Sequence, residues 1–229
     1  MILSLRERVI MQIDIHSHRL YVKTGQIQFL ALDPLCPSDF KNLSDLYQRG
    51  ISLSVGVHPW KTINWAMVHK DELQQILSDP RISMIGEIGL DKVCPVPFRE
   101  QQQAYEAQLE MADLLRKPVL LHVVHTMAEI IKSPKIHLNV PAWIIHGFRG
   151  GRQEAQQYIA KGFYISFGMN YKPESLTACP LDRIFLETDD SGGNVNDLYI
   201  QVATLLKCPV EQLENQIEMN FRSIFPTLL

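Results

Sequence analysis

The strongest constraint in this sequence is the position of six side chains of the kinds that bind metal ions. Each lies at or just beyond the end of a short apolar run: His16 and His18 after the first run, and Glu87, His122, His146 and Asp189 after later ones. If each run is a strand of a parallel barrel, all six side chains arrive at the carboxyl-end rim. That rim is where the active sites of such barrels lie.

Short β-type runs alternate with helical patterns along the chain, which favours βα units and a parallel sheet. We expect strands at residues 9–15, 27–32, 51–57, 82–87, 118–122, 142–146, 162–167 and 183–188. We expect helices at residues 39–49, 64–77, 97–116, 126–132, 152–161, 195–206 and 209–225. This order predicts an α/β protein with a TIM-type (β/α)₈ barrel.

The first βα unit departs from that pattern. Only eight residues separate His18 from Ile27, whereas a parallel crossover usually needs about a dozen or more. We therefore expect either that the first helix is missing or that strand 27–32 is displaced or antiparallel. In each case the barrel is distorted on this side.

Length and charge limit the possible functions. With 229 residues, of which 46% are hydrophobic, the chain suits one domain spanning residues 1–229. Residues 1–10 are interpreted as an N-terminal extension, with Met1 and Met11 as alternative starts. A net charge of −3 excludes binding of long nucleic acid by phosphate neutralisation alone.

The remaining composition favours a cytosolic protein. The four cysteines form no CxxC pair and are expected to be reduced thiols. No apolar run approaches the roughly 18 residues that a membrane span needs, and the charged start does not resemble a signal peptide. We expect no membrane association and a monomer. The sequence also lacks a phosphate-binding GxxxxGK loop and a GxSxG nucleophile turn.

Each candidate ligand has a functional and a structural interpretation. His16 and His18 are two apart, so on a strand both imidazoles face one ion; alternatively, both are solvated after an edge strand. Glu87 lies between two glycines, Gly86 permitting close backbone approach and Gly89 a turn out of the strand. Its two oxygens can bridge two cations; alternatively, it belongs to a charged surface turn. Asp91 is a candidate to orient a ligand.

The later candidates also leave alternatives open. His122 and His146 are either hydrogen-bonded core residues or ligands of a second ion. In Glu187-Thr188-Asp189-Asp190, the sequence does not decide which acid faces the site, although Asp190 is expected to begin a turn. The histidines in other loops, His69 and His137, are expected to be solvated. His58, after another strand, is a candidate substrate contact.

With these motifs assembled, the chain resembles the TatD-type metal-dependent deoxyribonucleases, a branch of the amidohydrolase superfamily. The resemblance rests on His16-Ser17-His18, Gly56-Val57-His58-Pro59, Gly86-Glu87-Ile88-Gly89-Leu90-Asp91, Pro118-Val119-Leu120-Leu121-His122, His146-Gly147-Phe148-Arg149-Gly150 and Glu187-Thr188-Asp189. It implies a barrel whose rim holds two divalent ions, with Zn²⁺, Mn²⁺ or Mg²⁺ as candidates.

The resemblance also implies roles for individual residues. One ion would be held by His16, His18, Glu87 and Asp189, and the other by Glu87, His122 and His146. Glu87 and Asp189 would be the catalytic carboxylates, with Asp189 helping to deprotonate the attacking water. His58, His125 and Arg149 are the expected substrate contacts.

Three departures from the family pattern concern the substrate rim. Val124 stands where the family has a basic residue, residues 190–193 replace a proline-containing loop, and the segment after His18 is short. Our leading hypothesis is a metal-dependent deoxyribonuclease that acts on DNA ends or short single strands. The alternatives are a hydrolase of the same fold that acts on a small ester, lactone or amide, and a metal-binding homologue with little turnover.

Overall fold

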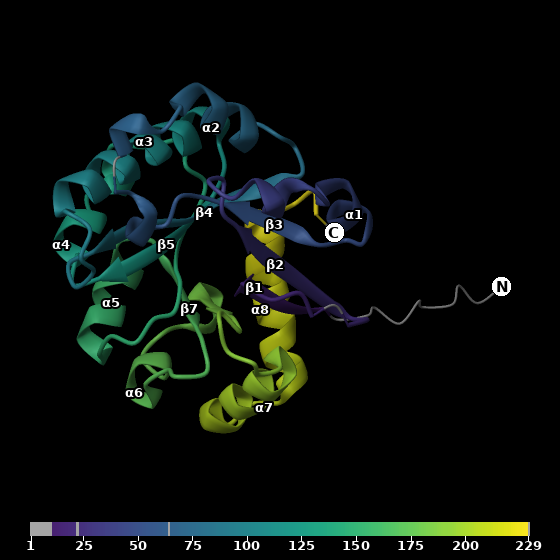
Figure 1. The fold of residues 1–229 in the computed structure, drawn as a ribbon. Coiled ribbons are helices and arrows are strands. Elements are labelled where there is room, and N and C mark those ends of the chain that lie inside the picture. Colours follow the sequence, from purple (N-terminus) through teal and green to yellow (C-terminus); the bar gives the residue numbers. More distant parts are fainter. Residues whose placement is uncertain (1–10, 22, 64, 229) are drawn as a thin grey trace.

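The computed structural model describes residues 11–21, 23–63 and 65–228, and its core is a parallel eight-stranded sheet (Figure 1). Neighbouring strands follow one another in chain order, from β1 to β8, and all pairs are parallel. The strands are β1 Gln12–Ser17, β2 Gln26–Leu32, β3 Ser52–Val55, β4 Ile82–Asp91, β5 Val119–Val124, β6 Trp143–Ile145, β7 Tyr164–Phe167 and β8 Ile184–Leu186. Each expected strand is present, and the prediction of a TIM-type barrel is confirmed.

Helices cover the outside of the sheet. They are α1 Leu43–Gln48, α2 Lys70–Leu77, α3 Phe98–Leu115, α4 Met127–Ile130, α5 Arg152–Ala160, α6 Pro173–Leu176, α7 Val195–Leu206 and α8 Val210–Ile224. Short 3₁₀ turns occur at η1 Pro37–Phe40, η2 Pro59–Lys61, η3 Trp65–Met67, η4 Ser133–Lys135 and η5 Leu181–Arg183. Helix α6 was not predicted. No helix in the described part of the chain is long and apolar enough to cross a lipid bilayer.

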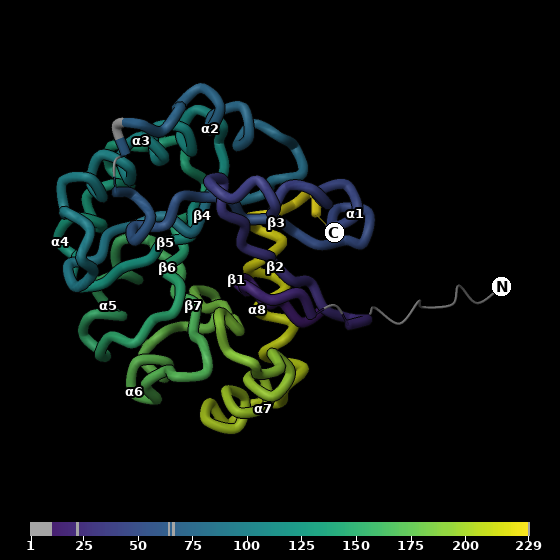
Figure 2. Tube along the Cα trace, in the orientation of Figure 1, coloured from purple at the N-terminus to yellow at the C-terminus, as the bar shows by residue number. Residues whose placement is uncertain are grey.

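The strands are apolar on both faces because the barrel interior covers one face and helices cover the other. In β8, for example, Ile184, Phe185 and Leu186 are all fully buried. Strand β6 lies between β5 and β7, as the trace in Figure 2 shows, and all three of its residues are buried. Strands of this kind bring the polar residues that follow them to one end of the barrel.

The first βα unit has no helix among the described residues between β1 and β2. The two strands are nevertheless parallel, with Gln12 opposite Gln26, so the displaced or antiparallel alternative is wrong and the missing-helix alternative is right. Helix α8 packs on this region instead. The ring centroid of Phe29 in β2 lies 6.0 Å from that of Phe221 in α8 and 4.9 Å from that of Phe225, the residue that follows the helix. The second helix after β8 therefore covers the strands left bare by the short connection.

Within the described residues, one β-bridge closes the barrel. Ser17, at the end of β1, pairs in parallel with Asp189 beyond β8, and the Asp189 N–H donates to the His16 carbonyl at 3.0 Å. This bridge places the ends of the first and last strands side by side. The predicted N-terminal extension, residues 1–10, lies outside the described residues.

Candidate metal centre

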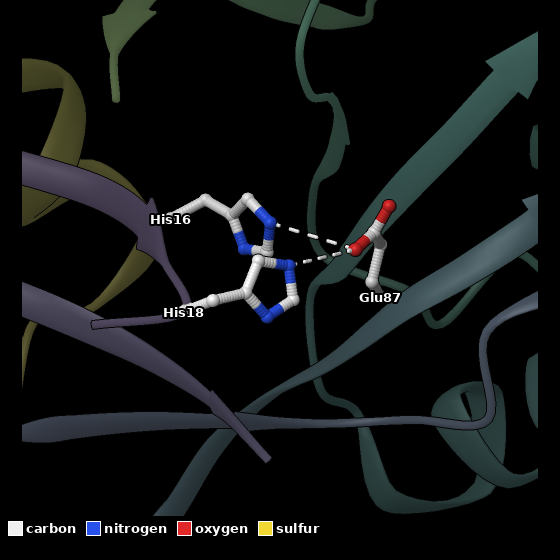
Figure 3. A group of neighbouring side chains, drawn as sticks. All are labelled: His16, His18 and Glu87. Carbon is white, nitrogen blue, oxygen red and sulfur yellow. Dashed lines mark ion pairs between the residues drawn. The ribbon is translucent and has the colours of Figure 1, made fainter. Parts of the chain in front are cut away.

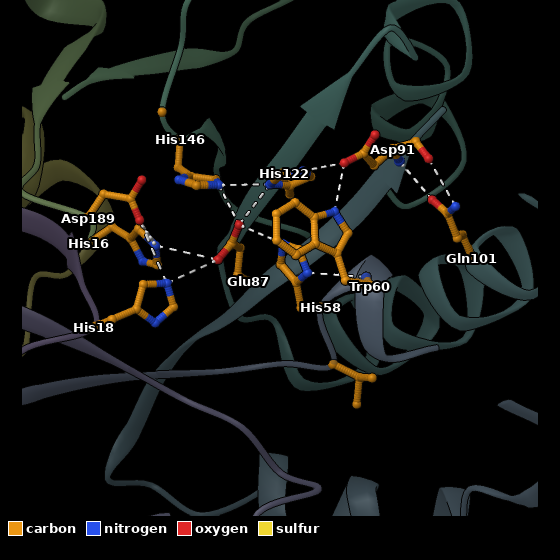
Figure 4. A network of polar contacts seen from close by, with 12 residues as sticks. His16, His18, His58, Trp60, Glu87, Asp91, Gln101, His122, His146 and Asp189 are labelled. Carbon is orange, nitrogen blue, oxygen red and sulfur yellow. Dashed lines mark hydrogen bonds and ion pairs between the residues drawn. The ribbon is translucent and has the colours of Figure 1, made fainter. Parts of the chain in front are cut away.

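The six predicted ligands meet at the carboxyl-end rim of the barrel, with Glu87 at their centre (Figure 4). Glu87 belongs to β4, and its side chain is only 7% exposed. Its two carboxylate oxygens face two different sets of imidazoles. This division organises the whole site.

The first group consists of His16, His18 and Asp189. The Nε2 atoms of His16 and His18 each lie 3.5 Å from Glu87 Oε2, and dashed lines mark these two contacts in Figure 3. They lie 3.5 Å and 3.7 Å from Asp189 Oδ1. His16 is fully buried and the side chain of His18 is 38% exposed, so the interpretation of both as solvated histidines is wrong for His16.

The second group consists of His58, His122 and His146, which gather at the other oxygen of Glu87. Their distances to Glu87 Oε1 are 3.1 Å from His58 Nε2, 2.9 Å from His122 Nδ1 and 2.5 Å from His146 Nε2. His58 was expected only as a substrate contact. Its place against Glu87 shows that it lies inside the cluster.

Glycines allow the backbone of β4 to approach its neighbours. A Cβ atom at Gly86 would lie 2.8 Å from the Leu120 carbonyl oxygen of β5, which is too close for a side chain. Gly89 does not begin a turn out of the strand, as the sequence suggested, because β4 continues to Asp91. With φ +149°, Gly89 instead passes so near the His122 carbonyl that no other residue fits.

Two carboxylates stand behind the second group and fix its imidazoles. Asp91 Oδ2 lies 3.2 Å from His122 Nε2, the orienting role expected for it. Glu187 Oε1 lies 3.3 Å from His146 Nδ1 and accepts the Gly147 N–H at 2.6 Å. With a proton held on each of these outer nitrogens, His122 Nδ1 and His146 Nε2 face Glu87 unprotonated, and their lone pairs are available to a metal ion.

The three acids of the last motif separate into different positions. Asp189 faces the first group, fully buried Glu187 supports His146, and exposed Asp190 lies at the rim near His18 and Asp189. The sequence alone could not assign these roles, because Asp189 has a left-handed backbone with φ +51°. Simple strand alternation does not hold for such a residue.

Electrostatics at the centre favour a cation. Burial alone would raise the pKa of Glu87, but the positive charge of His146 and hydrogen bonding by His122 lower it well below its usual value. Burial opposes a charged His16, yet contacts with Asp189 and Glu87 raise its pKa to about 9. Burial would raise the pKa of Asp189, but His16 and His146 lower it to about 2. Ionised carboxylates that draw protons onto imidazoles mark a negative potential in which a cation can replace those protons.

The donor atoms also fit metal ligation. Both ring nitrogens of His16 are buried without a normal hydrogen bond among the described residues. Its 3.5 Å separations from the two carboxylates are too long for good hydrogen bonds. They suit atoms that share one ion, because ligands about 2.0–2.2 Å from an ion lie roughly 3.3–3.6 Å apart at the tetrahedral angle. Imidazole and carboxylate donors together suit Zn²⁺ or Mn²⁺.

A cavity of about 940 Å³ opens beside these groups. The expected substrate contacts His58, His125 and Arg149 all line it, and so does Val124. His125 and Arg149 are exposed at its rim rather than part of the cluster. The prediction for His137 is wrong, because this side chain is buried and lies 2.9 Å from Glu106. His69 is exposed, as expected.

Comparison with known proteins identifies the relatives of this arrangement. The family profile of TatD-related DNases matches residues 18–226. The curated 3'-5' ssDNA/RNA exonuclease TatD of Salmonella typhimurium is 30% identical over 149 residues, which make up 59% of this chain and 56% of that protein. The match therefore spans little more than half of the relative's length.

Solved structures share the fold at lower sequence identity. YJJV, a TatD homologue from Escherichia coli K12, superposes with a TM-score of 0.79 at 21% identity and covers 96% of this chain and 99% of that one. A TatD-family hydrolase from Entamoeba histolytica gives a TM-score of 0.78 at 17% identity, covering 95% and 99%. These similarities extend over nearly the whole chain.

Proposed function

Because this chain belongs to the family of TatD-related DNases, we propose that it is a metal-dependent phosphodiesterase that hydrolyses single-stranded DNA. One observation carries the proposal: the two oxygens of Glu87 face two separate histidine groups. A carboxylate placed in this way can bridge two cations. Two ions held there would supply positive charge for both the attacking and the leaving oxygen of a phosphodiester.

The first ion would be held by His16, His18, Asp189 and Glu87 Oε2, and the second by His122, His146 and Glu87 Oε1. His58 has a different task. Its Nδ1 accepts the backbone N–H of Trp60 at 3.2 Å, and burial lowers the pKa of His58. The neutral ring therefore carries its proton on Nε2. That nitrogen is then a hydrogen-bond donor to Glu87 or to a substrate oxygen rather than a ligand.

Of the two central carboxylates, Asp189 is the better proton acceptor. The side chain of Glu87 is 7% exposed and both of its oxygens contact imidazoles, whereas Asp189 is 26% exposed. Water can therefore reach Asp189. In this role Asp189 takes the proton of the attacking water, and Glu87 holds the two histidine groups in position.

The rim residues would contact the strand around the scissile bond. His125 and Arg149 line the cavity from the segments after β5 and β6, where an exposed cation or hydrogen-bond donor can meet a phosphate. Val124 supplies no charge at its place on the cavity wall. Neutralisation of the substrate then falls mainly to the ions and to these two side chains.

The test is cleavage of an end-labelled single-stranded oligonucleotide by purified protein supplied with Mg²⁺, Mn²⁺ or Zn²⁺. We expect metal-dependent shortening of the strand, abolished by Glu87→Gln. The matched control is Glu110→Gln, an exposed carboxylate on α3 outside the site, which should behave like the native protein. If no metal supports cleavage above the level of Glu87→Gln, the proposal fails. An RNA strand of the same sequence tests whether both sugars are accepted.

A second candidate, hydrolysis of a small carboxylic ester, lactone or amide, is favoured by the apolar part of the cavity. Leu32, Val123, Val124 and Ile145 line it beside the metal-facing groups, a mixture typical of small-molecule sites. A panel of carboxylic and phosphate esters separates the two candidates. Turnover of the carboxylic esters without cleavage of nucleic acid would favour this one.

A further inference from the structure

Trp60 is an aromatic side chain held in the open at the edge of the metal centre. It lies on η2, lines the cavity and is 59% exposed. The other two tryptophans, Trp65 and Trp143, are buried, with 1% and 6% exposure. An indole left this open beside a catalytic cluster is an exception to the usual burial of large apolar rings.

The ring of Trp60 is fixed in place although it is exposed. Its Nε1–H donates to Oδ2 of buried Asp91 at 2.7 Å, and the same oxygen lies 3.2 Å from His122 Nε2 (Figure 4). The ring centroid is 5.0 Å from that of His58 and 5.9 Å from that of His122, with interplanar angles of 90° and 77°. Neither imidazole lies flat against the indole. A rigid aromatic surface therefore remains open next to the groups that face Glu87.

The charges around this ring leave little electrostatic attraction for a nucleic acid strand. Lys61, the neighbouring cation on the cavity wall, is paired with Asp33 at 2.7 Å. Asp39 and Glu154 add negative charge to the lining of the cavity. Affinity for a strand beyond that supplied by the ions, His125 and Arg149 must come from contacts that do not depend on charge, and stacking of bases on aromatic rings is such a contact.

We infer that Trp60 is a platform on which an unpaired nucleobase of the substrate stacks, beside the phosphodiester that is cleaved. This inference rests on the proposed nuclease function and adds a base-binding subsite to it. A base inside a duplex is already stacked on both faces, so the platform selects single strands or frayed ends. Every base has a flat face, so selection among base types is weak.

The opposing explanation is that Trp60 only orients Asp91 and, through it, His122. Two variants separate the explanations. Trp60→Phe keeps a flat ring but loses the N–H donor to Asp91, and Trp60→Leu loses both. Tyr47→Leu is the matched control, because Tyr47 is 53% exposed on α1 and does not line the cavity.

The experiment measures binding to the full-length, metal-supplied protein. The ligands are a phosphorothioate oligothymidylate, which resists cleavage, and an abasic strand with the same backbone. Intrinsic fluorescence reports on Trp60 in the native protein, and the anisotropy of dye-labelled strands gives the dissociation constants of all variants. Cleavage of an unmodified strand is assayed separately.

We expect saturable quenching by oligothymidylate and binding roughly 5–150-fold tighter than to the abasic strand, which corresponds to about 1–3 kcal/mol per stacked base. Trp60→Leu should remove this preference, Trp60→Phe should keep most of it, and Tyr47→Leu should not change it. Equal binding of the two strands by native protein, or equal losses in Trp60→Phe and Trp60→Leu, would overturn the inference. If unmodified strands are still cleaved in that case, the proposed function stands without the platform. Base-dependent binding without any cleavage would support the platform and contradict the proposed nuclease function.

Discussion

The two histidine groups around Glu87 contain similar ligand atoms but differ in what supports them. In the second group, Asp91 and Glu187 lie behind His122 and His146. In the first group, His16 Nδ1 has no hydrogen-bond partner within the described part of the chain, and His18 is 38% exposed. One half of the centre is therefore fixed by buried carboxylates, and in the proposed two-ion centre the other half would depend more on its ion.

This difference suggests a division of labour. Outer carboxylates orient a ligating imidazole and increase its basicity, so in the proposed two-ion centre the second group would hold its ion more firmly. The first group is the side that water reaches, through His18 and Asp189. We expect the second ion to be the more permanent one and the first to lie where the attacking water is prepared.

Removing the carboxylate that the groups share should have the largest effect. Glu87→Gln leaves both groups without their common anion, and we expect cleavage to fall on the order of 10⁴-fold or more, as for one member of an interdependent catalytic unit. Metal content per chain, measured by elemental analysis, should fall for both ions. Retention of two full equivalents of metal by the variant would contradict the bridging role.

Asp189→Asn tests the first group alone. Loss of the proton acceptor should lower kcat by roughly 10²–10⁴-fold, while the ion of the second group stays bound. The measurement combines single-turnover cleavage with metal content. The control is Asp182→Asn, because Asp182 is exposed on η5 and does not line the cavity. If both variants lose activity equally, Asp189 has no special role as acceptor.

The sequence predicts the strands and the ligands for a common physical reason. An apolar run that ends in a polar residue fixes both a buried strand and the place where its end meets the rim, so His122 in β5 and His146 after β6 could be located without coordinates. The short connection after β1 left two alternatives, a missing helix or a displaced or antiparallel strand, and the first is observed among the described residues. Its replacement by α8 could not be predicted, because the contact of Phe29 with Phe221 joins distant parts of the chain.

The supporting residues were harder to predict than the ligands. Glu187 and Asp189 are two apart, yet they serve opposite groups, because the chain leaves β8 at Leu186 and Asp189 takes a left-handed conformation. His58 was expected to contact substrate, but the tautomer that decides what it can bind is set by the backbone N–H of Trp60. Roles of this kind depend on which nitrogen or oxygen faces which neighbour, and that is set by tertiary packing rather than by residue type.

Variants of the outer carboxylates, Asp91 and Glu187, test the support of the second group. Asp91→Asn and Glu187→Gln keep the side-chain shape but weaken the hold on His122 and His146. We expect each to reduce affinity for the second ion by about 10–100-fold, with the first ion nearly unaffected. Competition with a chelator of known affinity measures this. Glu110→Gln serves as control, since Glu110 is exposed on α3 and does not line the cavity.

The smallest expected effect lies in the native protein itself. If outer carboxylates are what distinguishes the groups, a chelator should remove the two ions in separate steps, with the first group emptying roughly tenfold faster, the lower end of the effect of such partners. Activity should disappear with the first step, because that ion lies beside Asp189. Release of both ions in one step would mean that Glu87 couples the groups so tightly that the outer carboxylates no longer set the difference. Earlier loss of the second ion would reverse the comparison, because the first group would then bind its ion more tightly. In that case the burial of His16 would matter more than the carboxylates behind His122 and His146.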